Sequence, residues 1–323
     1  MITLRRSRLA RLALVAAGAL ALGACDLLEP PKPYAAGHVD APGVAYEDGA
    51  IALHVHDEEG GVELEPHEAV LQAVPASETT VPSDPAFSFL GDPGDPVWVL
   101  PEVQDPELLW LGYAAEEVET GVFEDDELTW QLVEVDGPGD VFLFTVDPFG
   151  TPDVLFDSKN GLPDSTAIGV GEHHHASWAF TAPGHYEVTY VVGGTLVGGG
   201  PVDSGPVQFT FVVGEYECGD VDDVTITPSP ARVGRPVEVA YTLENCGTQT
   251  SDVGASVTVR APVSCGGGST TVTGSTRTLD AGETATDSVT FNAPSCRGTY
   301  TVKVKADEVP YRYAEQRSLK VRR

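Results

Sequence analysis

Histidine is the residue type with the clearest potential for chemistry in this sequence, because all eight histidines lie between residues 38 and 185. His173 and His175 are two positions apart. Side chains with that spacing on an extended strand point to the same face, so this pair can reach one metal ion together. His54 and His56 share the spacing and form a second candidate pair. The sequence therefore indicates metal binding before any other chemistry.

The ligand types narrow the choice of metal. No cysteine lies between residues 26 and 217, so a site here must use nitrogen and oxygen ligands, which favours Zn²⁺ or Mn²⁺ over Cu(I). The alternative interpretation is that residues 173–175 form a solvated turn and that Trp178 and Phe180 belong to the core. A third use of the histidines in the sequence, as structural hydrogen-bonding groups, includes His38 at the domain entrance.

Enzymatic motifs are not indicated. The sequence has no nucleophile-elbow motif, and no carboxylate pair stands out for glycoside cleavage. The acidic run at residues 124–127 lacks the ligand spacing and the glycine of a calcium loop. We therefore expect a protein that is not an enzyme.

Alternating apolar residues predict the strands that must position these side chains. Period-two patterns occur at residues 51–55, 128–135, 141–146, 186–191 and 208–213. Turn residues separate them, which is typical of an antiparallel β-sandwich or barrel, and we expect a sandwich. Helical signal is nearly absent, and only residues 66–74 offer a turn or two of helix. We expect an all-β protein.

The charge distribution predicts two units. The whole chain has 18 basic and 49 acidic residues, but residues 34–214 contain 33 acids and one base, Lys159, whereas residues 215–323 contain 14 acids and 12 bases. Such a break favours two separate domains that meet near Gly214. Nucleic acid is excluded as a partner because binding phosphates requires clustered Lys and Arg. The excess of acidic residues is explained for the most part by a need for solubility, and the alternative explanation is that the acids attract cations.

The second unit, residues 215–323, reads as a disulfide-linked sandwich. Residues 237–243 alternate strictly, and about seven strands in this length are typical of an immunoglobulin-like fold. Its four cysteines are Cys218, Cys246, Cys265 and Cys296. In an exported protein they predict two disulfides. Three connectivities are open, and we favour the sequential pairing of the first with the second and the third with the fourth.

The beginning of the chain is typical of a secreted lipoprotein. Four arginines within residues 1–11 precede an apolar run at residues 12–22, which together describe a cleaved signal peptide at residues 1–24. Leu22-Gly-Ala-Cys25 resembles the bacterial lipobox, which implies a lipid on Cys25 and a location on the outer face of the bacterial cell membrane. Residues 25–37 are proline-rich and predict a stiff tether. The export route, Sec or twin-arginine, stays open.

Both units resemble known surface domains. Leu243-Glu-Asn-Cys-Gly-Thr, Leu279-Asp-Ala-Gly-Glu-Thr and Gly298-Thr-Tyr resemble the CARDB domain, an adhesion-type sandwich of bacterial and archaeal surfaces. Residues 38–214 resemble the choice-of-anchor M domain through Gly37-His-Val-Asp, Leu109-Trp-Leu-Gly, Gly137-Pro-Gly, His173-His-His-Ala-Ser-Trp and Pro183-Gly-His-Tyr.

The second resemblance completes a ligand set. The family motif H-x-H-x-x-W falls on His173, His175 and Trp178, and the motif G-H-x-D falls on His38 and Asp40. Family members often lie beside ABC transporters of the metal-ion type. The resemblance therefore implies a lipid-anchored surface protein that captures Zn²⁺ or Mn²⁺ for such a transporter. The alternative is a structural or adhesive protein that binds cell wall, glycan or protein without metal, to which the aromatic side chains of Trp98, Trp110 and Trp130 would contribute.

Overall fold

The computed structural model describes residues 30–323, so the signal peptide and Cys25 lie outside the described residues. The described part is built from β-strands and short 3-10 turns, which confirms the all-β prediction. The turns are η1 (Pro66–Glu68), η2 (Pro75–Ser77), η3 (Pro85–Phe87), η4 (Glu124–Asp126), η5 (Ser158–Asn160) and η6 (Val263–Cys265). Within residues 30–323 no helix has the length and hydrophobicity that crossing a bilayer requires.

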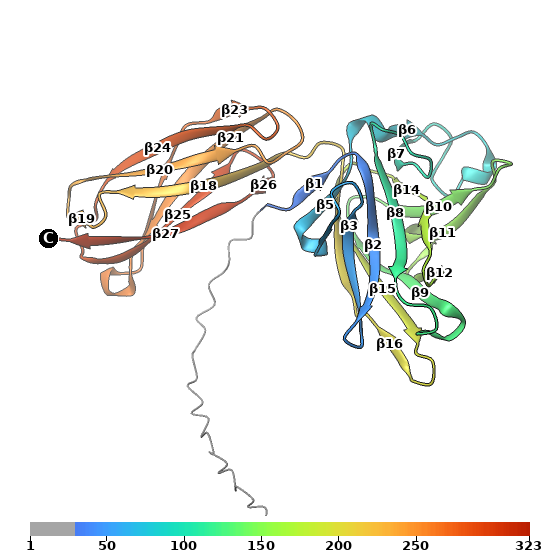
Figure 1. Ribbon diagram of the computed structural model, residues 1–323. Helices are drawn as coiled ribbons and strands as arrows, with labels where there is room; N and C mark the ends of the chain where they lie inside the picture. The colour runs from blue at the N-terminus through green and yellow to red at the C-terminus, as the bar shows by residue number, and fades with distance from the viewer. Residues whose placement is uncertain (1–29) are drawn as a thin grey trace, which may run out of the picture.

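The N-terminal unit contains three sheets (Figure 1). Its side chains form one large hydrophobic core and a smaller apolar cluster that includes Val97, Phe142 and Phe144. The largest runs in the order β1 (Lys32–Tyr34), β5 (Ala69–Ala73), β17 (Val207–Val213), β15 (Gly184–Thr195), β9 (Glu127–Asp136) and β12 (Asp164–Gly169), with β16 (Pro201–Asp203) paired to β15. The second runs in the order β11 (Pro152–Asp157), β10 (Val141–Val146), β14 (Ser177–Phe180), β7 (Pro96–Leu100) and β6 (Glu78–Thr80). The third runs in the order β13 (His173–His175), β8 (Leu109–Glu117), β2 (Gly37–Glu47), β3 (Ala50–Asp57) and β4 (Val62–Leu64).

The alternation of the sequence led us to expect purely antiparallel sheets, but these sheets also contain parallel pairs. Strand β2 runs parallel to β8, and β5 runs parallel to both β1 and β17. Parallel neighbours require long connections, and each of these pairs is separated by at least one other strand in the sequence. The difference matters for the candidate ligands, because pairing with β8 on both sides brings β2, which carries His38 and Asp40, near β13, which carries His173 and His175.

Two segments differ from their sequence-based description. Within the expected tether, Lys32–Tyr34 forms β1, the Tyr34 ring lies in the core, and the Lys32 ammonium contacts the Asp57 carboxylate at 2.8 Å. Within residues 66–74, only Pro66–Glu68 is helical, as a 3-10 turn, and the next residues form β5. Because β5 lies between two strands and is buried along its whole length, it shows no alternation.

The C-terminal unit is a two-sheet sandwich with its own core. One sheet contains β24 (Thr284–Asn292), β20 (Pro236–Glu244), β18 (Cys218–Thr227) and β26 (Tyr311–Arg312). The other contains β19 (Ala231–Arg232), β27 (Ala314–Arg322), β25 (Gly298–Asp307), β21 (Ser251–Arg260) and β22 (Ser269–Thr273), with β23 (Arg277–Leu279) paired to β21.

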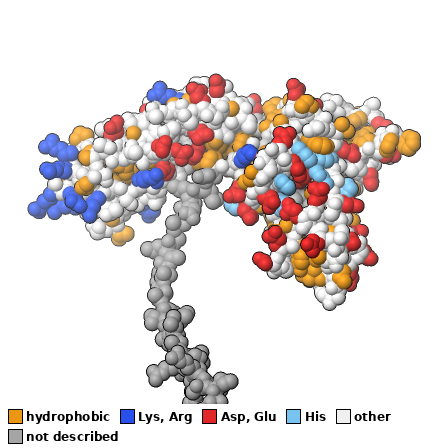
Figure 2. Space-filling model, in the orientation of Figure 1, with side chains coloured by type: hydrophobic (Ala, Val, Ile, Leu, Met, Phe, Trp, Pro, Cys, Tyr) orange, Lys and Arg blue, Asp and Glu red, His pale blue; other side chains and the backbone are white. Residues whose placement is uncertain are grey.

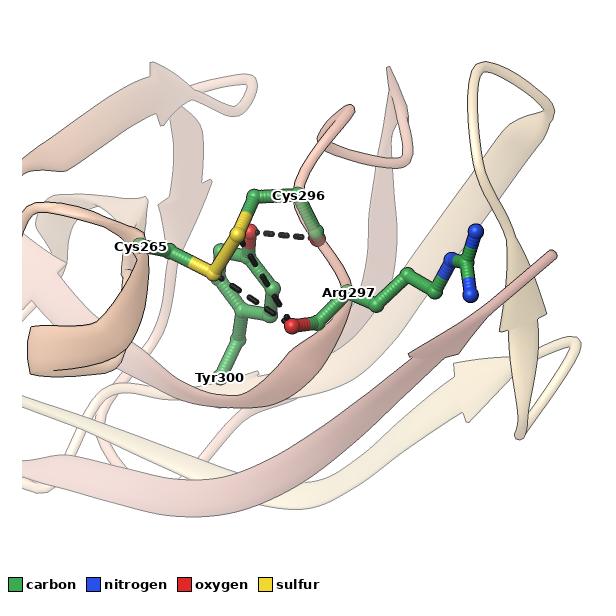
Figure 3. The surroundings of a disulfide bond; sticks show 4 residues. All are labelled: Cys265, Cys296, Arg297 and Tyr300. Atoms are coloured by element: carbon green, nitrogen blue, oxygen red, sulfur yellow. Dashed lines mark hydrogen bonds between the residues drawn. A yellow bond between two sulfur atoms is a disulfide. The ribbon is translucent and has the colours of Figure 1, made fainter.

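Two disulfides stabilise this sandwich, one of which begins at the first residue of β18. They join Cys218 to Cys246 and Cys265 to Cys296, which is the sequential pairing favoured from the sequence. Figure 3 shows that Tyr300 lies beside the second disulfide, and its hydroxyl donates a hydrogen bond to the Cys296 carbonyl at 2.8 Å. The disulfide and this hydrogen bond together fasten the loop before β25.

Candidate metal centre

The third sheet of the N-terminal unit gathers the candidate ligands on one side, which we call the histidine face. Its members are His38, Asp40, His54, His56, His173 and His175. Strand pairing explains their convergence: Gly112 on β8 lies opposite His175 on one side and opposite Asp40 on the other. Directly paired residues share a face of the sheet, and so do residues two positions apart. The sequence-predicted ligands on β2 and β13 therefore meet across β8.

Gly112 leaves the space in which they meet. A Cβ atom at this position would overlap Oδ1 of Asp40 and would lie only 2.9 Å from Nε2 of His173. The central strand thus contributes no side chain, and the flanking side chains lean over its backbone. This glycine forms a cradle that any other residue would fill.

The distances within this cradle match the spacing of metal ligands. Oδ1 of Asp40 lies 3.0 Å from Nε2 of His173 and 3.4 Å from Nε2 of His38, and the two Nε2 atoms are 3.2 Å apart. A tetrahedral ion with Zn–N distances of about 2.0–2.1 Å holds its ligand atoms about 3.3 Å apart. His175 offers a fourth ligand atom, and all four atoms lie within 4.8 Å of one another.

The carboxylate of Asp40 is the most unusual group of the centre. It is 0% exposed, and no hydrogen bond of good geometry reaches either oxygen from the described residues. Burial, together with the nearby charge of Glu58, raises the pKa of Asp40 to about 7. A buried carboxylate without a donor or a cation is costly. A divalent cation would remove that cost.

Two of the imidazoles, those of His38 and His175, are held in the neutral form that binds metal. Burial, together with the nearby His38 and His173, lowers the pKa of His175 to about 4. Burial also lowers the pKa of His38, and the neighbouring His173 lowers it to a smaller extent. Neither ring nitrogen of His175 has a hydrogen-bond partner of good geometry among the described residues. Unprotonated, unpartnered nitrogens are what a metal requires of histidine.

Trp110 fixes the orientation of the fourth ligand. Its indole stacks on the imidazole of His175, with ring centroids 3.6 Å apart and planes inclined by 4°. The indole Nε1–H donates to the carbonyl of Glu102 at 2.9 Å. Because the hydrogen bond locks the indole and the stack locks the imidazole, His175 is oriented before any ion arrives.

Other sequence candidates lie away from the centre. His174 points to the opposite face, where its Nε2 contacts Glu172 at 2.8 Å. Trp178 is a core residue whose Nε1–H donates to the Leu111 carbonyl at 3.3 Å. Residues 173–175 form a strand and not a solvated turn. His185 lies outside the histidine face, and its Nδ1 contacts the Tyr311 hydroxyl of the C-terminal unit at 2.7 Å.

The structure adds acidic side chains that sequence reasoning did not single out. Glu58, Glu116 and His173 offer a second set of ligand atoms within 4.8 Å, and His54, His56 and Glu117 offer a third. Figure 2 shows the histidines of the N-terminal unit surrounded by acidic side chains. With 33 acids in this region, no sequence signal distinguishes these glutamates from the rest. The position of Glu116 and Glu117 at the end of an apolar strand was the available hint.

Comparison with known proteins assigns part of the C-terminal unit. The model of the CARDB family matches residues 220–310. This segment is a CARDB domain. The sequence-based resemblance is confirmed for these residues, and the match includes none of the histidine face. A comparison with curated proteins finds no match to the chain.

Solved structures resemble the chain only weakly. They include an alkylpurine DNA glycosylase of Pseudomonas fluorescens bound to DNA containing an abasic site analog (13% identity, 32% of this chain and 30% of that chain, TM-score 0.29). They also include a CARDB domain from Pyrococcus furiosus in complex with di-metal ions (16% identity, covering 33% of this chain and 90% of that chain, TM-score 0.25). A red sea bream transglutaminase matches at 10% identity, covering 61% of this chain and 27% of that chain, with a TM-score of 0.31. The chain spans 30% of the glycosylase chain, and similarity this low carries no argument about function.

Proposed function

We propose that this protein is a non-enzymatic surface protein of bacteria that captures a divalent metal ion, Zn²⁺ or Mn²⁺, through His38, Asp40, His173 and His175. The observation that carries the proposal is the fully buried Asp40 carboxylate, which faces two imidazole nitrogens at 3.0 and 3.4 Å and accepts no hydrogen bond of good geometry among the described residues. Three imidazoles and one carboxylate are a ligand set that suits Zn²⁺, and the carboxylate also suits Mn²⁺.

The resemblance to the choice-of-anchor M domain supports a role in metal supply. Its two histidine motifs fall on the four residues that converge in the cradle. Members of that family often lie beside ABC transporters of the metal-ion type. We therefore propose that the captured ion is passed to such a transporter. The acidic surroundings favour this role because they raise the local concentration of cations.

Calorimetric titration of the purified protein with Zn²⁺ and with Mn²⁺ tests the capture. The tightest binding event should weaken at least about 100-fold in the double variant His173→Ala/His175→Ala, because two of four ligands are lost. The matched control is His174→Ala, which removes a histidine from the same strand but from the other face. Binding no tighter than millimolar, or equal binding by the double variant and the control, would remove the proposal.

The proposed location depends on Cys25. The lipobox-like sequence before it supports a diacylglyceryl anchor, and the two disulfides of the CARDB domain are typical of an exported protein. Fractionation of cells that express the Cys25→Ala variant tests the anchor. The variant should leave the membrane fraction, and intact-mass measurement of the wild type should show the added lipid. An unmodified Cys25 thiol in membrane-free protein contradicts the proposal.

A second candidate function is adhesion without metal. The CARDB match at residues 220–310 favours it, because such domains resemble adhesion modules. Incubation of the purified protein with isolated cell wall distinguishes the two. Retention that survives a chelator supports adhesion, whereas absence of retention leaves metal capture as the better proposal.

A further inference from the structure

The histidine face continues past the first centre onto β3. His54 and His56 share this face, and strand pairing puts His54 opposite Gly43 and His56 opposite Asp40 on β2. Gly43 repeats the role of Gly112, because a Cβ atom there would overlap the His54 ring, with Cδ2 at 2.8 Å and Nε2 closer still. The imidazole of His54 therefore extends over the backbone of β2 and reaches Glu117 on β8.

We infer that His54, His56 and Glu117 form a second site for a divalent metal ion. Oε1 of Glu117 lies 3.4 Å from Nε2 of His54 and 3.8 Å from Nδ1 of His56. The three ligand atoms lie within 4.8 Å of one another. Two imidazoles and one carboxylate leave the remaining positions of the ion open to water, as in sites that bind zinc with three protein ligands.

The burial of His54 argues against a purely structural role. The residue is only 9% exposed, and its Nε2 has no hydrogen-bond partner of good geometry among the described residues. A histidine that serves packing normally uses its buried nitrogen in a hydrogen bond. Here the nitrogen faces Glu117, the last residue of β8, in a position to share an ion with it.

Glutamates connect this site to the first centre. Oε1 of Glu58 lies 3.8 Å from Nδ1 of His56, and Oε2 of Glu116 lies 3.6 Å from Nδ1 of His173. Glu58, Glu116 and His173 also offer ligand atoms within 4.8 Å of one another. Potential metal ligands therefore form a continuous row across the sheet, from His175 at one end to His54 at the other. Their negative charge favours a second cation at short range and disfavours an anion.

The second site goes beyond the proposed function, because none of its three ligands belongs to the first centre. Metal content of the purified protein after equilibration with Zn²⁺ and removal of free ion tests it. The wild type should hold two ions per chain, and His54→Ala/His56→Ala should hold one. The control His67→Ala removes an exposed histidine outside the face and should hold two. Circular dichroism of each variant confirms the fold.

A second variant covers the case in which loss of the buried His54 prevents folding. Glu117→Gln keeps the shape of an exposed side chain and should weaken the second binding event at least about tenfold in calorimetry. A wild type with one ion that only His173→Ala/His175→Ala removes overturns the second site and leaves the proposed function intact. One ion that only His54→Ala/His56→Ala removes overturns the first centre instead. Equal metal content of wild type and a folded His54→Ala/His56→Ala variant also overturns the second site.

Discussion

Two fully buried polar side chains, one in each unit, differ in whether they are hydrogen-bonded. In the CARDB domain, the buried side chain of Asn245 donates to the carbonyls of Gln249 and Leu279 at 2.7 and 2.9 Å and accepts from the Gly247 N–H at 3.0 Å. In the N-terminal unit, Asp40 is equally buried, but no donor of good geometry reaches it from the described residues. A buried polar group whose hydrogen bonds are all made within the protein stabilises a unique fold, whereas one that lacks them can bind a ligand or an ion. The comparison separates stability in one unit from binding in the other.

The largest expected effect tests this separation in the CARDB domain. Replacing Cys218 and Cys246 with alanine should lower the free energy of unfolding of that domain by about 3–4 kcal/mol, because their disulfide closes a loop with a sequence separation of 28. Metal affinity should remain within about twofold, since every proposed ligand is distant from the change. Denaturant unfolding and calorimetry measure the two quantities.

The other disulfide provides the control for this experiment. Cys265→Ala/Cys296→Ala opens a loop of similar length, with a sequence separation of 31, and should give a similar loss of stability. If either variant weakens metal binding as strongly as it weakens the fold, the two units are not energetically separate, and the comparison breaks.

The fold followed from the sequence wherever one face of a strand is buried. The alternation at residues 128–135 lies within β9, and that at residues 237–243 lies within β20. Residues 141–146 form β10 as expected, although the first four residues of this strand are buried on both faces. The pattern failed at β5, which is buried along its whole length and shows no alternation, since its one polar side chain, Gln72, is buried as well. It also failed to reveal which strands pair in parallel, because pairing between distant segments leaves no local signal.

The candidate site was predictable in its ligands but not in its geometry. The two-residue spacing of His173 and His175 correctly predicted a shared face, and the structure brings His38 and Asp40 to them. In the sequence, Gly112 was noticeable only as part of a motif. The requirement for a residue without a side chain at this position becomes clear only once β2 and β13 are paired with β8. Whether the centre binds metal stays a prediction.

Filling the cradle should produce the next largest effect. Gly112→Ala introduces a Cβ atom into the space between Asp40 and His173, so the ligands must move apart, and small displacements weaken a site strongly. We expect the affinity for Zn²⁺ to fall about 100-fold, equivalent to about 2.7 kcal/mol. Competition with a chelator of known affinity measures the change. An unchanged affinity with an unchanged fold contradicts the role of this glycine.

Two aspartates on neighbouring strands offer a smaller and sharper contrast. Asp57 accepts hydrogen bonds from Lys32 at 2.8 Å, Tyr34 at 3.0 Å and the Gly60 N–H at 2.8 Å. Although burial raises the pKa of Asp57, the Lys32 and Gly60 donors hold it below its ordinary value. Asp40, with no such donors among the described residues, has a raised pKa.

The matched variants Asp57→Asn and Asp40→Asn should therefore act in opposite directions on the metal-free protein. Asp57→Asn should lower the free energy of unfolding by about 1–2 kcal/mol, allowing for the solvent exposure of Lys32. Asp40→Asn should leave it unchanged or raise it, because it removes an uncompensated buried charge. Only Asp40→Asn should weaken metal binding. Denaturation of chelator-treated protein measures stability, and equal destabilisation by both variants contradicts the contrast.

The smallest expected effect concerns the orientation of His175. Trp110→Phe keeps an aromatic ring against the imidazole but loses the indole hydrogen bond to the Glu102 carbonyl. A hydrogen bond of this kind contributes about 0.5–1.5 kcal/mol, so affinity should fall only about threefold. Trp110→Ala removes the stack as well and should weaken binding further. If the two variants bind metal equally, the stack contributes nothing to holding His175, and the centre is oriented by strand pairing alone.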